Sequence, residues 1–147
     1  MNLSRSRSSA PRTLAATVLA AATLGAGLPA VAHADPGDVS VSITVVNNTN
    51  KTLKLDDLHA DEGAWVHYPA PNIAKSGSNF IKTESSVDEG DTAGFVRYKS
   101  AKAVVEIRWE NQYDGENSFS CKVPDSMICT MTGDEQSADA NVKITVK

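Results

Sequence analysis

The chain lacks the sequence patterns that usually mark an enzyme. Its 147 residues include only three histidines and two cysteines. They contain no G-x-S-x-G elbow, no phosphate-binding glycine loop and no H-E-x-x-H zinc motif. A metal site built from His59, Asp61 and His67 is conceivable, but two histidines flanking a turn explain the same pattern more simply. The acidic run at 88–91 is typical of a solvated turn. We therefore predict that the protein is not an enzyme and holds no metal or other cofactor.

Long hydrophobic runs are also scarce, and the one that is present lies at the start of the chain. Three arginines precede the apolar run 14–28, and Ala32-His33-Ala34 follows it as an A-x-A cleavage signature. This order is that of a secretory signal peptide and not of a permanent membrane anchor. We predict that residues 1–34 are removed and that residues 35–147 form a single secreted, extracellular domain.

The chain has fewer basic residues than acidic ones. The chain has 14 Lys and Arg against 18 Asp and Glu, a net charge of −4. Loss of the predicted signal peptide, with its three arginines and no acids, would make the mature domain more negative still. An acidic surface repels nucleic acid and anionic lipid. We expect no nucleic-acid partner, whereas neutral and zwitterionic lipid head groups remain possible targets.

The two cysteines, Cys121 and Cys129, both lie in the predicted mature domain. Exported proteins meet an oxidising environment, so a disulfide between this pair is the default expectation. The closed loop is short, and the chain-entropy model gives a stabilisation of about 2.6 kcal/mol. No cluster of further Cys or His ligands lies nearby in the sequence to favour a metal site instead.

No segment of the mature chain shows helical periodicity. Residues 39–45 alternate apolar and hydroxyl side chains, which predicts a strand with one buried face. We expect 52–55 to pair back onto it as a hairpin. The last strand, 141–147, has Lys143 and Lys147 pointing outward, which favours a sheet edge. Other strands are expected at 64–68, 79–83, 92–99, 101–109, 118–122 and 127–131. Many short strands separated by turns indicate an all-β sandwich or barrel.

The stretch 109–117 is the most distinctive part of the chain. Trp109 ends an alternating strand on the face that carries other apolar residues, which favours a core position. An Asp114-Gly115 turn follows, for which glycine supplies a positive φ. We expect Asn111 and Asn117 to hold this loop by bonding backbone groups.

Several motifs together resemble those of the aegerolysins, a family of small acidic β-sandwich proteins found in fungi and bacteria. The similarity spans about Val41 to Val146 and is closest to bacterial members related to small insecticidal crystal toxins. The residues that carry it are Ile43–Thr49, Gly63–Trp65, Trp109–Asn111, Tyr113, Gly115 and Asn117. The family motif usually has Pro after this Asn, where the present chain has Gln112.

The resemblance implies an actinoporin-like sandwich of two packed antiparallel sheets. It also implies recognition of membrane lipid, either a sphingolipid or another zwitterionic lipid. The protein would then be the membrane-targeting component of a two-component, hemolysin-like pore-forming toxin, with a larger partner protein that opens the pore. Trp65, Trp109 and Tyr113 match aromatic positions of the family. Tyr68, which precedes Pro69, is the fourth candidate for lipid contact because tyrosine beside a turn suits the head-group level.

Other interpretations of the same residues remain open. Trp65 and Trp109 are large enough that core packing alone explains them. Exposed Trp and Tyr rings also stack on sugars, so a secreted, lectin-like carbohydrate-binding module is an alternative. An extracellular protein-interaction domain is a third.

Overall fold

A computed structural model describes residues 39–85 and 90–147. These residues belong to one compact unit. The predicted signal peptide, 1–34, lies outside the described residues. The described chain is entirely strands, turns and loops. Its ten strands are β1 (Val39–Asn47), β2 (Leu53–Glu62), β3 (Ala64–His67), β4 (Asn72–Ile73), β5 (Ser78–Ser85), β6 (Thr92–Ser100), β7 (Ala103–Asn111), β8 (Ser118–Lys122), β9 (Cys129–Asp134) and β10 (Asp139–Val146).

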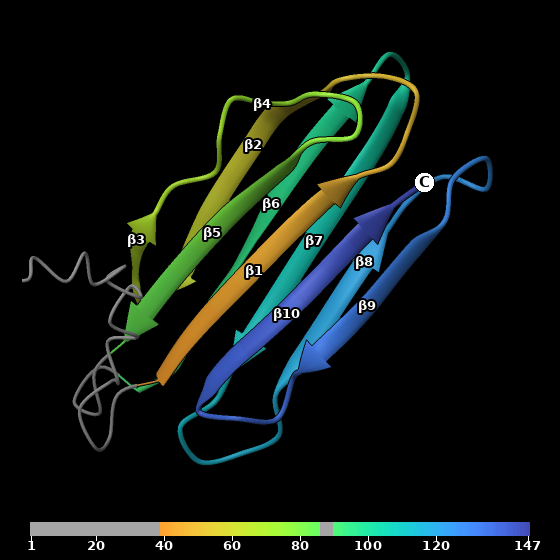
Figure 1. The fold of residues 1–147 in the computed structure, drawn as a ribbon. Helices are drawn as coiled ribbons and strands as arrows, with labels where there is room; N and C mark the ends of the chain where they lie inside the picture. The colour runs from red at the N-terminus through yellow and green to blue at the C-terminus, as the bar shows by residue number, and fades with distance from the viewer. Residues whose placement is uncertain (1–38, 86–89) are drawn as a thin grey trace, which may run out of the picture. The chain divides into compact units, whose positions relative to one another are not determined.

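The strands form two five-stranded sheets that pack face to face (Figure 1). Sheet A has the order β3-β5-β1-β10-β9, and sheet B has the order β4-β2-β6-β7-β8. The predicted all-β sandwich is confirmed. Neighbouring strands are antiparallel except for β1 and β10, the first and last strands of the described chain, which pair in parallel at the centre of sheet A.

Two expectations about strand pairing are wrong. Residues 52–55 do not form a hairpin with β1, because the connection after Asn47 carries the chain into the other sheet, where β2 pairs with β4 and β6. The final strand is not an edge, since β10 lies between β1 and β9. Lys143 points outward because side chains alternate along a strand, and this alternation occurs in central strands as well.

The core lies between the sheets and follows the alternation seen in the sequence. In β1, every second residue from Val39 to Val45 is at most 1% exposed. The inward side chains of β10 in sheet A and of β6 and β7 in sheet B pack with these β1 residues in a single core. Tyr98 is the largest fully buried side chain, and its hydroxyl donates to Asn79 Oδ1 at 3.3 Å. Burial raises the pKa of this phenol, which keeps it neutral.

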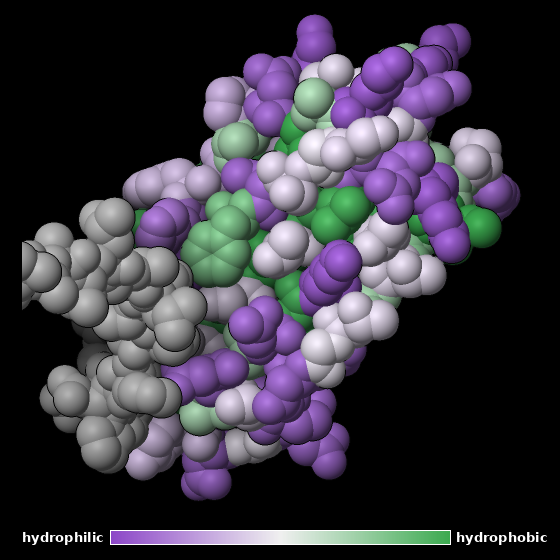
Figure 2. Space-filling model, viewed as in Figure 1, coloured by the Kyte–Doolittle hydropathy of each residue, from purple (hydrophilic) through white to green (hydrophobic). Residues whose placement is uncertain are grey.

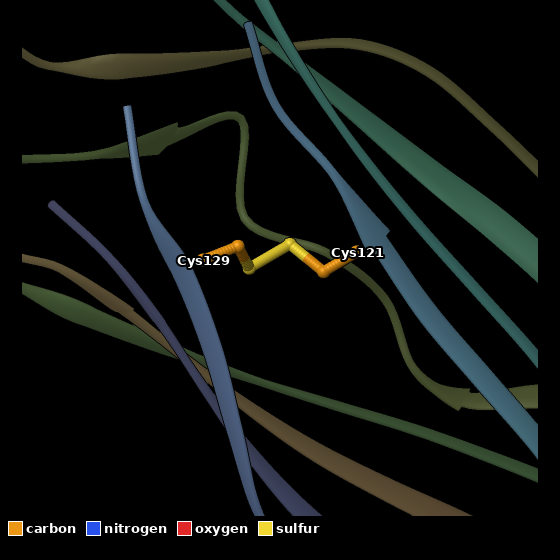
Figure 3. Close-up of a disulfide and its surroundings, with 2 residues drawn as sticks. All are labelled: Cys121 and Cys129. Carbon is orange, nitrogen blue, oxygen red and sulfur yellow. A yellow bond between two sulfur atoms is a disulfide. The ribbon is translucent and has the colours of Figure 1, made fainter. Parts of the chain in front are cut away.

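The predicted disulfide between Cys121 and Cys129 is confirmed (Figure 3). The S–S distance is 1.97 Å and the two Cα atoms lie 6.2 Å apart. Cys121 lies on β8, the edge of sheet B, and Cys129 lies on β9, the edge of sheet A. The disulfide therefore joins the two sheets along one open side of the sandwich.

Candidate functional site

Three aromatic rings form a continuous stack that runs from the core to the surface. Trp109 is 3% exposed and lies inside the sandwich. Its indole meets that of Trp65 edge to face, with ring centroids 5.5 Å apart. Trp65 is half-buried and stacks on the ring of Tyr68 at 5.7 Å. Tyr68 is 68% exposed, so the stack presents one ring to solvent on a rigid support.

The position of the stack follows from the strands that carry it. Trp65 pairs with Thr83 on β5, whose buried side chain defines the inward face of sheet A. A register shift between Trp65 and His67 breaks the alternation after the tryptophan. On sheet B, Trp109 pairs with Gly94. A Cβ at Gly94 would lie 2.8 Å from Trp109 Cζ2, so the glycine makes room for the indole to lie across the sheet.

Exposed apolar side chains also occur on β3 and on its neighbour in sheet A, β5. Val66 is 45% exposed and Phe80 is 43% exposed. The ring of Phe80 meets His67 edge to face at 5.3 Å. We call the group Trp65, Val66, His67, Tyr68 and Phe80 the β3 patch.

The outer face of sheet A beside this patch mixes weakly polar side chains with charged ones, and apolar atoms show between them (Figure 2). Its nearest charges on β5, Lys82 and Glu84, pair with each other. The charges on the β5 side of the patch therefore cancel. Such a surface suits a neutral or zwitterionic partner better than a strongly charged one.

Tyr113 lies elsewhere, in the loop between β7 and β8. Its side chain is 52% exposed, and its backbone N–H donates to Asp91 Oδ1 at 2.8 Å. Within the described residues, none of the aromatic pairs includes Tyr113. Of the four predicted contact residues, the structure thus brings together Trp65, Tyr68 and Trp109 and separates Tyr113. Of those three, only Trp65 and Tyr68 reach the surface.

The loop that holds Tyr113 is built on two asparagines, as the sequence predicts. Asn111 is fully buried and donates to the carbonyl oxygens of Ser40 and Ala138, both at 2.8 Å. Asn117 accepts from Gln112 N–H at 2.9 Å and donates to the backbone of the β9–β10 connection.

The turn in this loop differs from the prediction in one respect. The glycines with positive φ are Gly63, Gly90 and Gly133 among the described residues, so Gly115 does not use its freedom at positive φ. A Cβ at Gly115 would instead lie 1.9 Å from Gln112 Oε1. The Gln112 side chain therefore occupies the space that a side chain at 115 would need.

The outer face of sheet B carries an aromatic ring whose surroundings are already filled. The guanidinium carbons of Arg97 and Arg108 lie 5.2 and 4.8 Å from the centre of the Phe95 ring. Both arginines also bond Glu106, at 2.6 Å from Arg97 and 2.8 Å from Arg108. Hydrogen bonds from Arg108 and Arg97 lower the pKa of Glu106. The arginines that contact Phe95 are thus already engaged in ion pairs with Glu106.

The residues considered for a metal site are not gathered together. His59 Nε2 lies 3.5 Å from Asp61 Oδ1 on sheet B, whereas His67 belongs to β3 of sheet A and contacts Phe80. Across 39–85 and 90–147, no group of three or more His, Cys, Asp or Glu side chains could hold a metal ion.

The sequence reasoning missed Phe80 and Val66. Phe80 could have been found, because it occupies the outward phase of β5 between the inward residues Asn79 and Ile81. A large ring on the polar face of a strand is a signal of an exposed apolar surface. Val66 had no comparable signal, since the irregular pairing next to it is invisible in the sequence.

Comparison with known proteins supports the fold. No family model matches the chain, and no curated protein matches it. Among solved structures, the fold is similar to that of the lipid binding protein Nakanori, with a TM-score of 0.67 and 11% sequence identity. The match covers 74% of this chain and 71% of that one. At this identity the likeness establishes a shared sandwich architecture. No helix capable of crossing a membrane occurs in the part of the chain that the structure describes.

Proposed function

We propose that this protein is a secreted, aegerolysin-like lipid-recognising module that binds neutral or zwitterionic membrane surfaces through the β3 patch. It acts by binding and performs no catalysis. The observation that carries the proposal is the aromatic stack, which supports an exposed tyrosine on two tryptophans fixed in the sandwich. The sandwich shared with a lipid binding protein supports the same conclusion.

The chemistry of the patch suits the interface of a bilayer. Tyrosine places its apolar ring among acyl chains and its hydroxyl among head groups. Val66 and Phe80 are further exposed apolar side chains of the β3 patch. Because Lys82 and Glu84 neutralise each other beside the patch, binding depends little on the charge of the lipid. Tyr113, at the loop end, is a separate and weaker contact in this proposal.

The disulfide supports the extracellular setting of this function. The disulfide between Cys121 and Cys129 is stable in an oxidising compartment, which fits the predicted signal peptide. The sphingolipid preference and the need for a larger pore-forming partner follow from the family resemblance. On this proposal the protein alone binds vesicles without releasing an entrapped dye.

The test is co-sedimentation with vesicles of phosphatidylcholine alone, with sphingomyelin, with a ceramide-type lipid, and with phosphatidylserine as the anionic comparison. We expect binding to at least one of the three compositions without phosphatidylserine. The affinity should be unchanged between about 0.1 and 0.5 M salt, because salt weakens charge–charge attraction and this contact does not depend on it. Tyr68→Ser should lower binding at least tenfold. Tyr113→Ser, which removes another exposed tyrosine ring, should lower it less.

Several results would count against the proposal. Failure to bind any zwitterionic vesicle would overturn it, and so would a larger loss for Tyr113→Ser than for Tyr68→Ser. Binding on a glycan array without binding to vesicles would favour the carbohydrate-binding alternative. Capture of one secreted protein without either would favour a protein-interaction domain.

A further inference from the structure

A pocket of about 400 Å³ opens at the end of the sandwich where the β1–β2 loop, the β6–β7 turn and the β8–β9 loop meet. Figure 1 shows these connections at the same end as the C-terminus. The volume falls within the range of about 300–1,000 Å³ that small-molecule sites occupy. The β3 patch contributes no residue to this pocket.

The β1–β2 wall of the pocket is fixed from within by Asn47, which is fully buried. Its amide donates to Lys51 O at 2.8 Å and to the carbonyl oxygens of Ile73, at the end of β4, and of Ala74, directly after it. Its carbonyl oxygen accepts from both the N–H and the hydroxyl of Thr49, at 3.0 and 2.7 Å. Asn47 and Thr49 thereby shape the loop, which leaves the side chains of Asn48, Asn50 and Lys51 for a ligand.

The opposite wall is fixed by backbone pairing. Ile128 N–H donates to Lys147 O at 2.6 Å, and Lys147 N–H donates back to Ile128 O at 2.9 Å. The Cys121–Cys129 disulfide closes the base of the same loop. A two-residue turn at 101–102, with Ala101 at φ 53°, completes the third side. A pocket with three such fixed walls binds without a large cost in ordering its loops.

The chemistry of the lining differs from that of the chain as a whole. Although acids outnumber bases in the sequence, no Asp or Glu lines the pocket. Its polar groups are amides, hydroxyls and ammonium groups, from Asn48, Asn50, Lys51, Ser100, Ser126 and Lys147, above the apolar Met127. Lys51 and Lys147 supply the two ammonium groups, and Lys51 lies in the wall that Asn47 holds.

We propose that this pocket binds an oxyanion carried on a hydroxylated scaffold, such as a sugar phosphate. Ammonium and amide N–H groups donate to the oxyanion, and hydroxyl-bearing side chains both donate to and accept from the scaffold. The same chemistry occurs in a free sugar phosphate and in an inositol phosphate lipid head group. This site is independent of the lipid contact at the β3 patch.

The experiment is a titration of the ¹⁵N-labelled protein with glucose 6-phosphate, glucose and inorganic phosphate, followed by amide chemical shifts. We expect saturable shifts from glucose 6-phosphate at residues 48–51, 100–103 and 126–127, with a Kd at least tenfold below those of glucose and phosphate. Lys51→Met should raise that Kd at least tenfold. Lys143→Met, on the outer face of sheet A, removes the same charge outside the pocket and should leave it unchanged.

Absence of saturable shifts overturns the proposal. So do shifts centred elsewhere, equal affinity for glucose and its phosphate, or equal effects of the two lysine variants. Vesicles that contain phosphatidylinositol 4-phosphate identify the source of the ligand. Competition by these vesicles for glucose 6-phosphate indicates a head group, and binding of glucose 6-phosphate without such competition indicates a soluble ligand. Either result supports the pocket as an oxyanion site.

Discussion

The two open sides of this sandwich are closed in different ways. On the side of β8 and β9, a covalent bond between Cys121 and Cys129 joins the edges of the two sheets. On the side of β2 and β3, aromatic side chains connect the two sheets. Trp65 of sheet A contacts Trp109 of sheet B, and Tyr68 stacks on the outer side of Trp65. A disulfide closes an edge with little exposed surface. An aromatic closure leaves a ring at the surface, and that ring is available for binding.

The comparison predicts that the aromatic side carries more of the stability. Replacing Trp109 by Ala removes the buried anchor of the stack and should lower the free energy of unfolding by about 3–5 kcal/mol. Urea unfolding followed by circular dichroism measures this loss. Tyr113→Ala, an exposed ring outside the stack, should change the same free energy by less than about 0.5 kcal/mol. A loss below about 1 kcal/mol for Trp109→Ala would show that the stack does not hold this side together.

The disulfide side should contribute less. Replacing both cysteines by Ser opens a short loop, for which chain entropy gives a loss of about 2.6 kcal/mol. Lipid binding should persist, because β3 and β9 are opposite edges of a five-stranded sheet, separated by about 19 Å. For the same reason the double cysteine variant and Tyr68→Ser should have additive effects on unfolding. Loss of vesicle binding in the cysteine variant, while it remains folded, would mean that the two sides are coupled.

The exposed end of the stack should matter for binding far more than for folding. Tyr68 is mostly exposed, so Tyr68→Ser should change the free energy of unfolding by less than about 1 kcal/mol. Its effect on vesicle binding is expected to be at least tenfold. If Tyr68→Ser instead lowered the free energy of unfolding as much as Trp109→Ala, Tyr68 would be a residue that closes the sandwich and not part of a ligand surface.

The smallest effect should come from the charge network on the outer face of sheet B, which belongs to neither side. The pKa of Glu106 is lowered from its usual 4.5 by its arginine partners. Its contribution to stability is therefore complete above about pH 4.5 and is lost as the pH falls through the lowered pKa. Glu106→Gln should reduce the acid-side slope of stability against pH and leave vesicle binding unchanged. An equal slope in both proteins would show that the network adds nothing measurable.

How far the sequence predicted this structure depended on whether a feature repeats locally. The alternation in β1 and the inward orientation of Trp109 could be predicted, because each follows from a period of two within one strand. The strand that pairs with residues 52–55 could not be predicted. Short alternating segments pair with many strands equally well, and here the connection after Asn47 passes to the other sheet.

The candidate site was predicted only in part, for related reasons. The sequence identified Trp65 and Tyr68, but their stacking depends on an irregular pairing in β3 that no periodicity reveals. Val66, which is exposed beside the same irregularity, was not identified. The oxyanion pocket was missed altogether, because its walls come from three loops far apart in the chain.

The most direct test of the central claim is quenching of tryptophan fluorescence by lipids brominated in their acyl chains, within whichever zwitterionic vesicle the protein binds. Trp65 lies at the β3 patch and Trp109 lies in the core. The account predicts that membrane binding quenches the wild-type emission and that Trp65→Phe, which keeps Trp109, removes most of this quenching while the protein still sediments with the vesicles. Undiminished quenching in Trp65→Phe, or none in the bound wild-type protein, would contradict membrane contact through the β3 patch.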